Sequence, residues 1–391
     1  MDLTLCLTHD CNLRCRYCYA GRKRTRTMPW ETVEAAVLFG IAESRAEARR
    51  TGQAPALTLS FFGGEPLLEW DLLQGADEFA AEACGRESVA LRRTLTTNMT
   101  LLDAEKTVWL LERGYWLGLS LDGNAAMHNA LRRYKGGRPS HTDCARALAL
   151  FEGHEDRAEI VCVIDPAQVR HLADGVRWLA EASRLRIALN PNFSAAWNER
   201  SLDEWKRQYA RIGDFYLARY RENRPVRVNV FDGKILTHVR GGYRACDRCG
   251  MGETEAAVAV SGRLYPCARL VGDDDRDDVC LGDVRRGFDA ARRLAMIARR
   301  GNRNLACVAC RWRTHCMNWC GCVNYVTSGG DIGMVGPLTC WHEKMAIAAA
   351  DRVAARLWEE KNAAFLARFY GGASPGTSSA EGCGPVETAA S

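Results

Sequence analysis

The sequence predicts an α/β fold built on a parallel sheet, followed by a smaller cysteine-rich domain. Strand-length apolar runs alternate with helical stretches through the first half of the 391 residues, and such alternation is typical of parallel α/β sheets. After Pro225 the chain becomes rich in Cys, Gly and Arg and has few long periodic segments. We therefore expect bound metal to supply part of the stability of this second region.

The first half is expected to contain six strands separated by helices. The expected strands are apolar runs at residues 3–7, 57–62, 90–96, 116–121, 160–164 and 185–189. The expected helices span residues 30–49, 70–84, 104–113, 144–151 and 167–182. The second helix, for example, places Leu72, Leu73, Ala76 and Phe79 on one face at roughly helical spacing. Periodicity alone allows either a partial barrel or an open doubly wound sheet.

These elements predict a sequential domain organisation. Residues 1–225 form the α/β catalytic domain, and a helix at 202–221 leads out of it. Residues 226–345 form the cysteine-rich domain. A closing C-terminal helix covers 346–371, with helical character from residue 341 onward. Residues 372–391 are rich in Ala, Ser, Gly and Pro, a composition typical of a disordered tail.

The composition excludes several classes of protein. No apolar run reaches the roughly 18 residues that a membrane crossing needs, and the N-terminus lacks the features of a secretory signal. A cytoplasmic protein without membrane contact is therefore expected. The net charge of +5 is modest, and no basic run interleaved with aromatic residues indicates nucleic-acid binding. The short basic segment 22–26 is expected to be a solvated loop.

The 18 cysteines carry most of the functional information. In a reducing compartment, clustered cysteines bind metal or perform redox chemistry rather than forming disulfides. They concentrate near the N-terminus and between residues 246 and 340. The scattered Cys84, Cys144 and Cys162 are expected to be small buried side chains. Cys6 is grouped with them despite its position, and Cys383 in the tail is expected to be incidental.

The first cluster has the spacing Cys11-x3-Cys15-x2-Cys18 and directly follows an expected strand. It therefore lies at the carboxyl end of the sheet, where α/β folds place their chemistry. Three thiolates can hold three irons of a 4Fe–4S cluster and leave the fourth iron open, as catalytic zinc sites keep a free position. A structural zinc knuckle is the alternative, but only His9 is nearby as a fourth ligand.

These cysteines, with Tyr17 before the last one, resemble the signature of the radical S-adenosylmethionine superfamily. The resemblance implies a partial (β/α)6 TIM-like barrel. It also implies that the amine and carboxylate of S-adenosylmethionine chelate the open iron. Electron transfer from the reduced cluster then splits the sulfonium and releases a 5′-deoxyadenosyl radical.

Three further segments at expected strand ends support the resemblance. The segment 63–66 is similar to the Gly-Gly-Glu-Pro motif that contacts the methionyl amine; its glycines allow close backbone approach. The segment 97–100 is similar to Thr-Asn-Gly-Thr, with Met99 in place of the usual Gly. By resemblance Ser120 and Arg132 hold the methionyl carboxylate, and Asn98 lies near the ribose or methionyl group. Asp122 and His128 remain open between functional and structural roles. The candidate contacts to S-adenosylmethionine are thus Gly63, Gly64, Glu65, Pro66, Asn98, Ser120 and Arg132.

The C-terminal cysteines resemble the seven-cysteine SPASM domain, an auxiliary-cluster extension of many radical enzymes that act on peptides and proteins. The resemblance implies two auxiliary 4Fe–4S clusters, hence three in all. One would be held by Cys307, Cys310, Cys316 and Cys340. The other would be held by Cys249, Cys267 and Cys320, with Cys246 as the fourth ligand. A pair of zinc ribbons is the alternative, although the gaps between the cysteines fit it only in part. Cys280 and Cys322 are left without a role.

The resemblance implies that the substrate is a peptide. We expect hydrogen abstraction from a ribosomally made peptide, loss of an electron to an auxiliary cluster, and an intramolecular C–S, C–C or C–O crosslink. Sulfatase-type oxidation of a side chain to formylglycine is one alternative, weakened because Ala268 follows Cys267 where sulfatase maturases have Asp, their proposed base. An iron–sulfur electron-transfer protein is the alternative from another class.

Two partners are expected besides the peptide. Flavodoxin or ferredoxin would serve as the electron donor. Because the cysteine motif begins at residue 11, recognition of a leader sequence is expected to need a separate protein or direct binding to the barrel and SPASM surface. The sequence assigns no general base.

Overall fold

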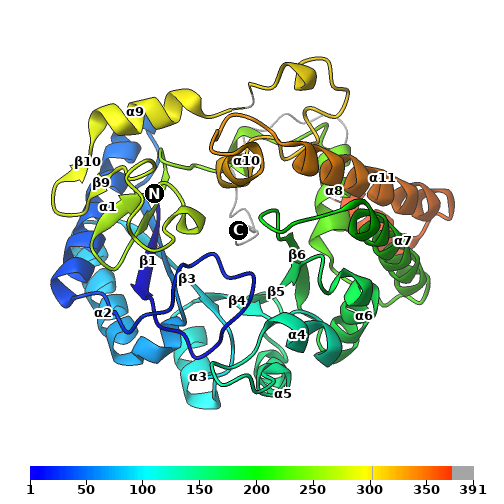
Figure 1. Ribbon diagram of the computed structural model, residues 1–391, viewed down its shortest axis with the longest axis horizontal. Helices are drawn as coiled ribbons and strands as arrows, with labels where there is room; N and C mark the ends of the chain where they lie inside the picture. The colour runs from blue at the N-terminus through cyan, green and yellow to red at the C-terminus, as the bar shows by residue number, and fades with distance from the viewer. Residues whose placement is uncertain (302, 372–391) are drawn as a thin grey trace. The chain divides into compact units, whose positions relative to one another are not determined.

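The computed structural model describes residues 1–301 and 303–371, which form two compact units (Figure 1). The first unit contains Met1–Ser120, Arg132–Ala158 and Gly250–Arg300; the second contains Leu121–Leu131, Glu159–Cys249 and the described residues from Gly301 onward. The units alternate along the chain, whereas the domains expected from the sequence follow one another. Those boundaries stay predictions, and the expected tail 372–391 lies outside the described residues.

The first unit is built on a mainly parallel sheet. Its strands are β1 (Asp2–Thr8), β2 (Ala56–Gly63), β3 (Ala90–Thr97), β4 (Trp116–Ser120), β7 (Glu255–Val258), β8 (Arg263–Tyr265), β9 (Gly282–Asp283) and β10 (Gly287–Phe288). Their order is β10-β9-β8-β7-β1-β2-β3-β4. The strands from β7 through β1 to β4 run parallel, and β8, β9 and β10 add antiparallel pairs. Strand β1 therefore lies inside the sheet, and Leu3, Leu5 and Leu7 are fully buried.

Helices α1 (Trp30–Thr51), α2 (Trp70–Arg86) and α3 (Ala104–Glu112) connect the parallel strands β1 to β4, as crossovers between parallel strands require. The first unit also contains α5 (His141–Arg146) and α9 (Ala290–Arg299). Figure 1 shows α1 and α2 side by side along the strands. Asp103 caps α3 by accepting from the amide of Lys106, and α1 ends at Gly52 in a left-handed conformation; both signals are typical of helix termini.

The second unit is mainly helical. It contains the parallel pair β5 (Ala158–Ile164, from Glu159 onward) and β6 (Arg186–Pro191). Its helices are α4 (Ala125–Leu131), α6 (Leu172–Ala182), α7 (Glu199–Arg221), α8 (Asn229–Val239), α10 (Gly321–Ser328), α11 (Pro337–Glu359) and α12 (Ala363–Tyr370). Helix α11 packs against α7 and α8 (Figure 1). In this contact the Trp205 ring stacks on His342 at 4.9 Å, and Tyr209 hydrogen-bonds to His342 Nε2 at 3.1 Å.

All six strands expected in the first half are confirmed as β1 to β6. The expectation of a single closing helix is wrong, because the helix is interrupted between α11 and α12. At this point Lys361 has a φ of +50° and Asn362 caps α12. The helix expected at 144–151 begins earlier, at His141, and ends as a 3₁₀ turn; the one expected at 167–182 begins at Leu172. Helices α4, α8, α9 and α10 and the short strands β7 to β10 were not predicted from the sequence.

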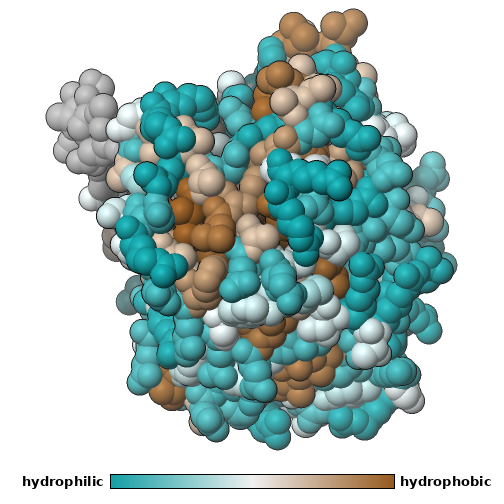
Figure 2. Space-filling model, turned by 90° about the vertical axis from the view of Figure 1, so that its left-hand side faces the viewer, coloured by the Kyte–Doolittle hydropathy of each residue, from teal (hydrophilic) through white to brown (hydrophobic). Residues whose placement is uncertain are grey.

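None of the described helices combines the length and the apolar character that a membrane crossing requires. Hydrophobic residues form small patches within the largely hydrophilic face drawn in Figure 2. Single exposed apolar side chains are normal on soluble proteins.

A buried carboxylate connects three segments of the first unit. Asp77 on α2 is 2% exposed; its Oδ1 accepts from Arg93 Nε at 2.5 Å and from the Tyr115 hydroxyl at 2.9 Å. Arg113 Nε lies 3.4 Å from Asp77 Oδ2. The carboxylate thus compensates two guanidinium groups and a buried hydroxyl between α2, β3 and the turn before β4.

Replacing Asp77 by Ala should lower the free energy of unfolding by about 3–5 kcal/mol, because the removal of one partner leaves buried charge uncompensated. Denaturant unfolding of the full chain measures the change. Glu82→Ala on the same helix removes an exposed ion pair with Arg86 and should cost less than about 1 kcal/mol. Equal effects of the two substitutions would contradict the role given to Asp77.

Candidate active site and auxiliary metal centre

The three cysteines of the N-terminal motif lie on the loop that follows β1, as predicted. Cys11 is buried, and its Sγ accepts a hydrogen bond from the amide of Leu13 at 3.4 Å. Cys15 is half-buried and Cys18 is exposed. Burial raises the pKa of the Cys11 thiol, so a bound metal is needed to hold it as a thiolate. The burial of the three cysteines thus decreases along the loop, from Cys11 in the interior of the unit to Cys18 at its surface.

The turn after β2 packs directly against this loop. The amide of Gly64 donates to the carbonyl of Thr8 at 2.7 Å, and the amide of Glu65 donates to the carbonyl of Asp10 at 2.9 Å. A Cβ at Gly64 would lie 1.7 Å from the Asp10 oxygen; one at Gly63, where φ is +130°, would lie 2.5 Å from the Thr8 oxygen. The glycines are therefore required by contact between two backbones, besides the ligand approach inferred from the sequence.

Glu65 lies at the centre of the turn and is almost fully buried. Its Oε1 accepts from Thr97 Oγ1 at 2.7 Å and from the amide of Leu67 at 3.1 Å, and its Oε2 accepts from the amide of Asn98 at 2.7 Å. Burial raises the pKa of Glu65 although these hydrogen bonds oppose the shift. A carboxylate offers about four acceptor positions, so capacity remains for an ammonium group. The residue fits the amine of S-adenosylmethionine, and that contact stays a prediction.

The segment after β3 joins Glu65 to the cysteine loop. Asn98 Nδ2 donates to Asn12 Oδ1 at 2.8 Å and lies 3.7 Å from the Sγ of Cys11. Met99, which stands where the family has Gly, is buried and has a φ of +69°. A residue with a Cβ pays about 1–2 kcal/mol for this conformation. The backbone at Met99 thus keeps the conformation that glycine favours. Met in place of Gly therefore adds backbone strain and leaves the backbone conformation unchanged.

The segment 132–135 pairs with the other side of the cysteine loop. The amide of Arg14 donates to the carbonyl of Arg133 at 2.7 Å, and the amide of Lys135 donates to the carbonyl of Asn12 at 3.0 Å. The side chain of Arg132 donates to the hydroxyl of Tyr17 at 2.8 Å. The predicted carboxylate-binding arginine is thus brought to the loop that carries the cysteines.

Ser120 and Cys144 complete the candidate site in the first unit. Ser120 is half-buried at the last position of β4. Cys144 on α5 is buried as expected, but its Sγ also donates to the carbonyl of Asn98 at 3.1 Å. No local pattern predicts this contact, because Cys144 and Asn98 are far apart in the chain. Pro66 is buried and begins the short 3₁₀ turn before α2.

Asp122 and His128, left open by the sequence analysis, have structural partners within the second unit. The amide of Asp122 donates to His128 Nδ1 at 3.2 Å, and Asp122 Oδ1 accepts from the amide of Val163 at 2.9 Å. Between them, Gly123 has a φ of +71°, and a Cβ there would lie 2.7 Å from the Cα of Gly175. These contacts favour the structural reading of both residues.

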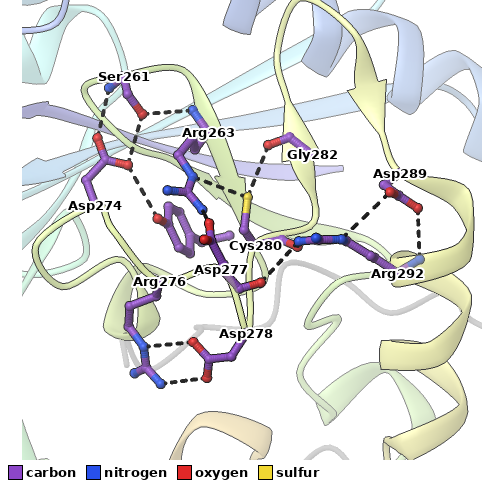
Figure 3. Close-up of polar contacts among 11 residues, drawn as sticks. Ser261, Arg263, Asp274, Arg276, Asp277, Asp278, Cys280, Gly282, Asp289 and Arg292 are labelled. Carbon is purple, nitrogen blue, oxygen red and sulfur yellow. Dashed lines mark hydrogen bonds and ion pairs between the residues drawn. The ribbon is translucent and has the colours of Figure 1, made fainter.

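Segment 22–26 is a loop in which Arg22 and Arg26 are exposed, as expected, and both residues also form ion pairs. The amide and the Nε of Arg22 donate to Asp273 at 2.6 and 3.0 Å, and Arg26 Nη1 lies 3.6 Å from Asp274 Oδ2. Asp274 is buried and also accepts from the amide and hydroxyl of Ser261 (Figure 3). These hydrogen bonds and ion pairs connect the loop that carries Cys11, Cys15 and Cys18 to the segment that follows Cys267.

The second unit brings four of the predicted auxiliary ligands together. Cys307, Cys310, Cys316 and Cys340 all line one narrow cavity between the cysteine-rich loop and α11. Within the described ranges, no three His, Cys, Asp or Glu side chains converge as a single metal ion would require. An iron–sulfur cluster binds each thiolate through a different iron, so its ligands surround a cavity instead. Four thiols that line one cavity match the four-cysteine ligand set of a 4Fe–4S cluster.

A buried ion pair supports this cavity. Lys234 Nζ on α8 lies 2.6 Å from Glu343 Oε2 on α11, and it also donates to the carbonyl of His315 at 3.3 Å. The same oxygen of Glu343 accepts from the amide of Met317 at 2.6 Å. Burial opposes the charge on Glu343, but Lys234 outweighs it and holds the pKa of this carboxyl below its usual value. The pair thus ties the cysteine loop to both helices.

The other predicted auxiliary ligands are divided between the units. Cys267 belongs to the first unit, while Cys249, Cys320 and Cys246 belong to the second, and their joint coordination of a cluster stays a prediction. Cys322 is buried with its Sγ 3.5 Å from that of Cys320, which places this leftover thiol beside a predicted ligand.

Cys280, the other leftover thiol, lies in a hydrogen-bonded loop of the first unit (Figure 3). Its Sγ accepts from Arg263 Nε at 3.5 Å and donates to the carbonyl of Gly282 at 3.4 Å. Arg263 also pairs with Asp277, and Arg292 donates to the carbonyls of Asp277 and Cys280. These contacts agree with a buried thiol that does not bind metal.

Comparisons with known proteins agree with this geometry. Residues 5–152 match the model of the Radical SAM superfamily. The chain is 23% identical over 329 residues to a cysteine-type anaerobic sulfatase-maturating enzyme of Clostridium perfringens, covering 79% of this chain and 85% of that protein. It is 26% identical over 338 residues to a serine-type anaerobic sulfatase-maturating enzyme of Klebsiella aerogenes, covering 83% of this chain and 80% of that protein.

Solved structures share the fold. Native anSMEcpe with bound AdoMet and Cp18Cys peptide matches 92% of this chain and 100% of its own, with a TM-score of 0.74 and 20% identity. SuiB of Streptococcus suis bound to precursor peptide SuiA matches 87% of this chain and 75% of its own, with a TM-score of 0.52 and 16% identity. The α/β fold class predicted from the sequence, a partial TIM-like barrel with a SPASM region, is confirmed.

Gly64→Ala should prevent the loop after β1 from packing on the turn after β2, because the new Cβ would overlap the Asp10 carbonyl. We expect reconstituted protein to lose iron and to release no 5′-deoxyadenosine. Gly85→Ala is the matched control, since a Cβ there meets nothing within 4 Å and Ala favours the interior of helix α2. Normal iron content in Gly64→Ala would contradict the packing argument.

Glu343→Ala should lower the free energy of unfolding by about 3–5 kcal/mol, because Lys234 would stay buried without its counter-ion. The loss should be accompanied by a lower iron content, since the amide of Met317 beside Cys316 also loses its acceptor. Denaturant unfolding and iron analysis measure the two effects. Glu360→Ala removes only the exposed pair with Arg221 and should change neither.

Proposed function

The chain is a radical SAM enzyme whose cofactors are S-adenosylmethionine and 4Fe–4S clusters, and we propose that it oxidises a side chain of a peptide substrate. The four-cysteine cavity of the second unit carries this proposal. Removing a hydrogen atom oxidises the substrate by one electron, and a stable product requires a second electron to leave. An auxiliary centre held by Cys307, Cys310, Cys316 and Cys340 would accept that electron.

The individual site residues have separate proposed roles. When bound, the clusters and S-adenosylmethionine supply the 5′-deoxyadenosyl radical and the electron acceptor. Cys11, Cys15 and Cys18 hold the initiating cluster, and Glu65 orients the methionyl amine through its remaining acceptor capacity. Arg132 and Ser120 bind the methionyl carboxylate. Asn98, held by Glu65 through its amide and by Asn12 through its side chain, keeps the loops around Cys11 in register.

The names of the relatives favour one of the possible products. The two relatives described above are named for maturation of sulfatases, which supports formylglycine formation from Cys or Ser over the crosslinking expected from the sequence. The likeness to the anSMEcpe structure with bound peptide supports a peptide substrate. Side-chain oxidation is therefore the first candidate.

Intramolecular crosslinking is the second candidate, and one observation favours it. Ala268 follows Cys267 where sulfatase maturases have the Asp proposed as their base. An alanine cannot accept a proton, so oxidation to formylglycine would need another base. Crosslinking to a nucleophile within the peptide does not depend on that particular residue. The likeness to SuiB with its bound precursor peptide agrees with this candidate as well.

Reconstituted enzyme should release 5′-deoxyadenosine in the presence of reductant and convert sulfatase-derived peptides that carry Cys or Ser at the target position. Formylglycine is an aldehyde, so the product should react with a hydrazide probe in mass spectrometry. A crosslink would show the loss of two hydrogen atoms without hydrazide labelling. The variant with Ala at Cys11, Cys15 and Cys18 should give neither product nor 5′-deoxyadenosine. Cluster redox activity without 5′-deoxyadenosine in the unaltered enzyme would favour an electron carrier instead.

A further inference from the structure

The second unit contains a cavity of about 370 Å³ that the proposed reaction does not use. Lys234 and His238 contribute to it from α8, Arg311 and His315 from the cysteine-rich loop, and Asp351 from α11. Its volume falls within the range of binding sites. All of its lining residues belong to one unit, so the cavity is defined within that unit alone.

The cavity adjoins the cavity of the four predicted ligands. Trp312 and Ile347 line both cavities, so one tryptophan ring and one aliphatic side chain separate the cation-lined space from Cys307, Cys310, Cys316 and Cys340. Electron transfer weakens steeply with distance. A redox partner seated at the cation-lined cavity would therefore lie beside the auxiliary centre.

The surface here is positively charged and only partly compensated. Arg311, Arg313 and Lys344 are exposed around the two cavities, against one exposed carboxylate, Asp351. Among the residues that the structure describes, none forms an ion pair with Arg311, whose guanidinium lies 3.8 Å from the centre of the Trp312 ring. Such a surface attracts acidic partners.

Two apolar side chains lie beside these charges on the same loop. Leu305 is 85% exposed and Val308 is 63% exposed, and Val308 stands between the predicted ligands Cys307 and Cys310. Exposed apolar groups with basic neighbours are typical of small transient interfaces. A free-standing anion site would not need them, so a protein partner is favoured over a small ion.

We propose that this surface, formed by the cation-lined cavity and residues 305–313, binds an acidic one-electron carrier protein that removes the electron left by substrate oxidation. The inference rests on the proposed function, because only an oxidative reaction needs this exit. The substrate loses one electron with the hydrogen atom that the 5′-deoxyadenosyl radical takes. It then loses a second electron and a proton; that electron passes through the auxiliary centre to the oxidised carrier, which is reduced by one electron.

An acidic flavodoxin serves as the probe, titrated in its oxidised form into anaerobic holoenzyme at low and at high salt. Arg311→Glu should weaken binding about tenfold, since it places like charges across the interface, and His238→Glu should weaken it as well. Binding to unaltered enzyme should fall with salt because the charges are exposed. Arg200→Glu on α7 is the matched control, because this exposed arginine lies outside both cavities and should leave binding unchanged.

Stopped-flow reduction of flavodoxin by prereduced holoenzyme gives a second measurement, which should slow in step with the binding loss. Unaltered binding in both Arg311→Glu and His238→Glu would overturn the proposal, as would equal weakening in Arg200→Glu. Displacement of flavodoxin by an acidic substrate peptide would assign the surface to the substrate and would also overturn it. If no peptide is oxidised while flavodoxin binding follows the expected pattern, the proposed function fails and the docking surface stands.

Discussion

The carbonyl oxygen of Asp10 lies where a side chain at position 64 would have to be, and the initiating site is organised around this contact. Strands β1 and β2 are parallel neighbours, so the loops at their carboxyl ends leave the sheet side by side. With two glycines, the backbones touch, and the amides of Gly64 and Glu65 donate to the carbonyls of Thr8 and Asp10. The carboxylate of Glu65 then lies against the end of β3, where it accepts hydrogen bonds from the Thr97 hydroxyl and the Asn98 amide. Three consecutive strand ends thus form one connected network.

The second unit solves a different physical problem. Its cysteine-rich loop has little regular structure and exposes Leu305 and Val308, so it gains little from apolar burial. A buried lysine–glutamate pair compensates by connecting the loop to α8 and α11. Such a pair contributes little net free energy but is costly to break. It therefore specifies the position of the loop, and bound metal supplies the stability that the loop lacks.

The sequence predicted the features that depend on local patterns. Alternating apolar runs located β1 to β6, and cysteine spacing located Cys11, Cys15 and Cys18 as well as the four cysteines that share a cavity. Features that depend on distant pairing were missed. Strand β7 has four residues, too few for a periodic signal, and it exists because it pairs with β1. The binding of Arg22 by Asp273 likewise joins segments that no local pattern connects, and the break after α11 depends on the single residue Lys361.

The place of β1 between β2 and β7 has a consequence for how the chain is made. Asp2 pairs with Glu255, so β1 obtains its second neighbour only after the chain has been synthesised as far as β7. Contacts of such high sequence separation form slowly. Until then one edge of β1 is open, and open edges recruit other chains into sheets. A fragment ending at residue 152 would contain the whole segment that matches the family model, yet it would keep that edge exposed for its lifetime.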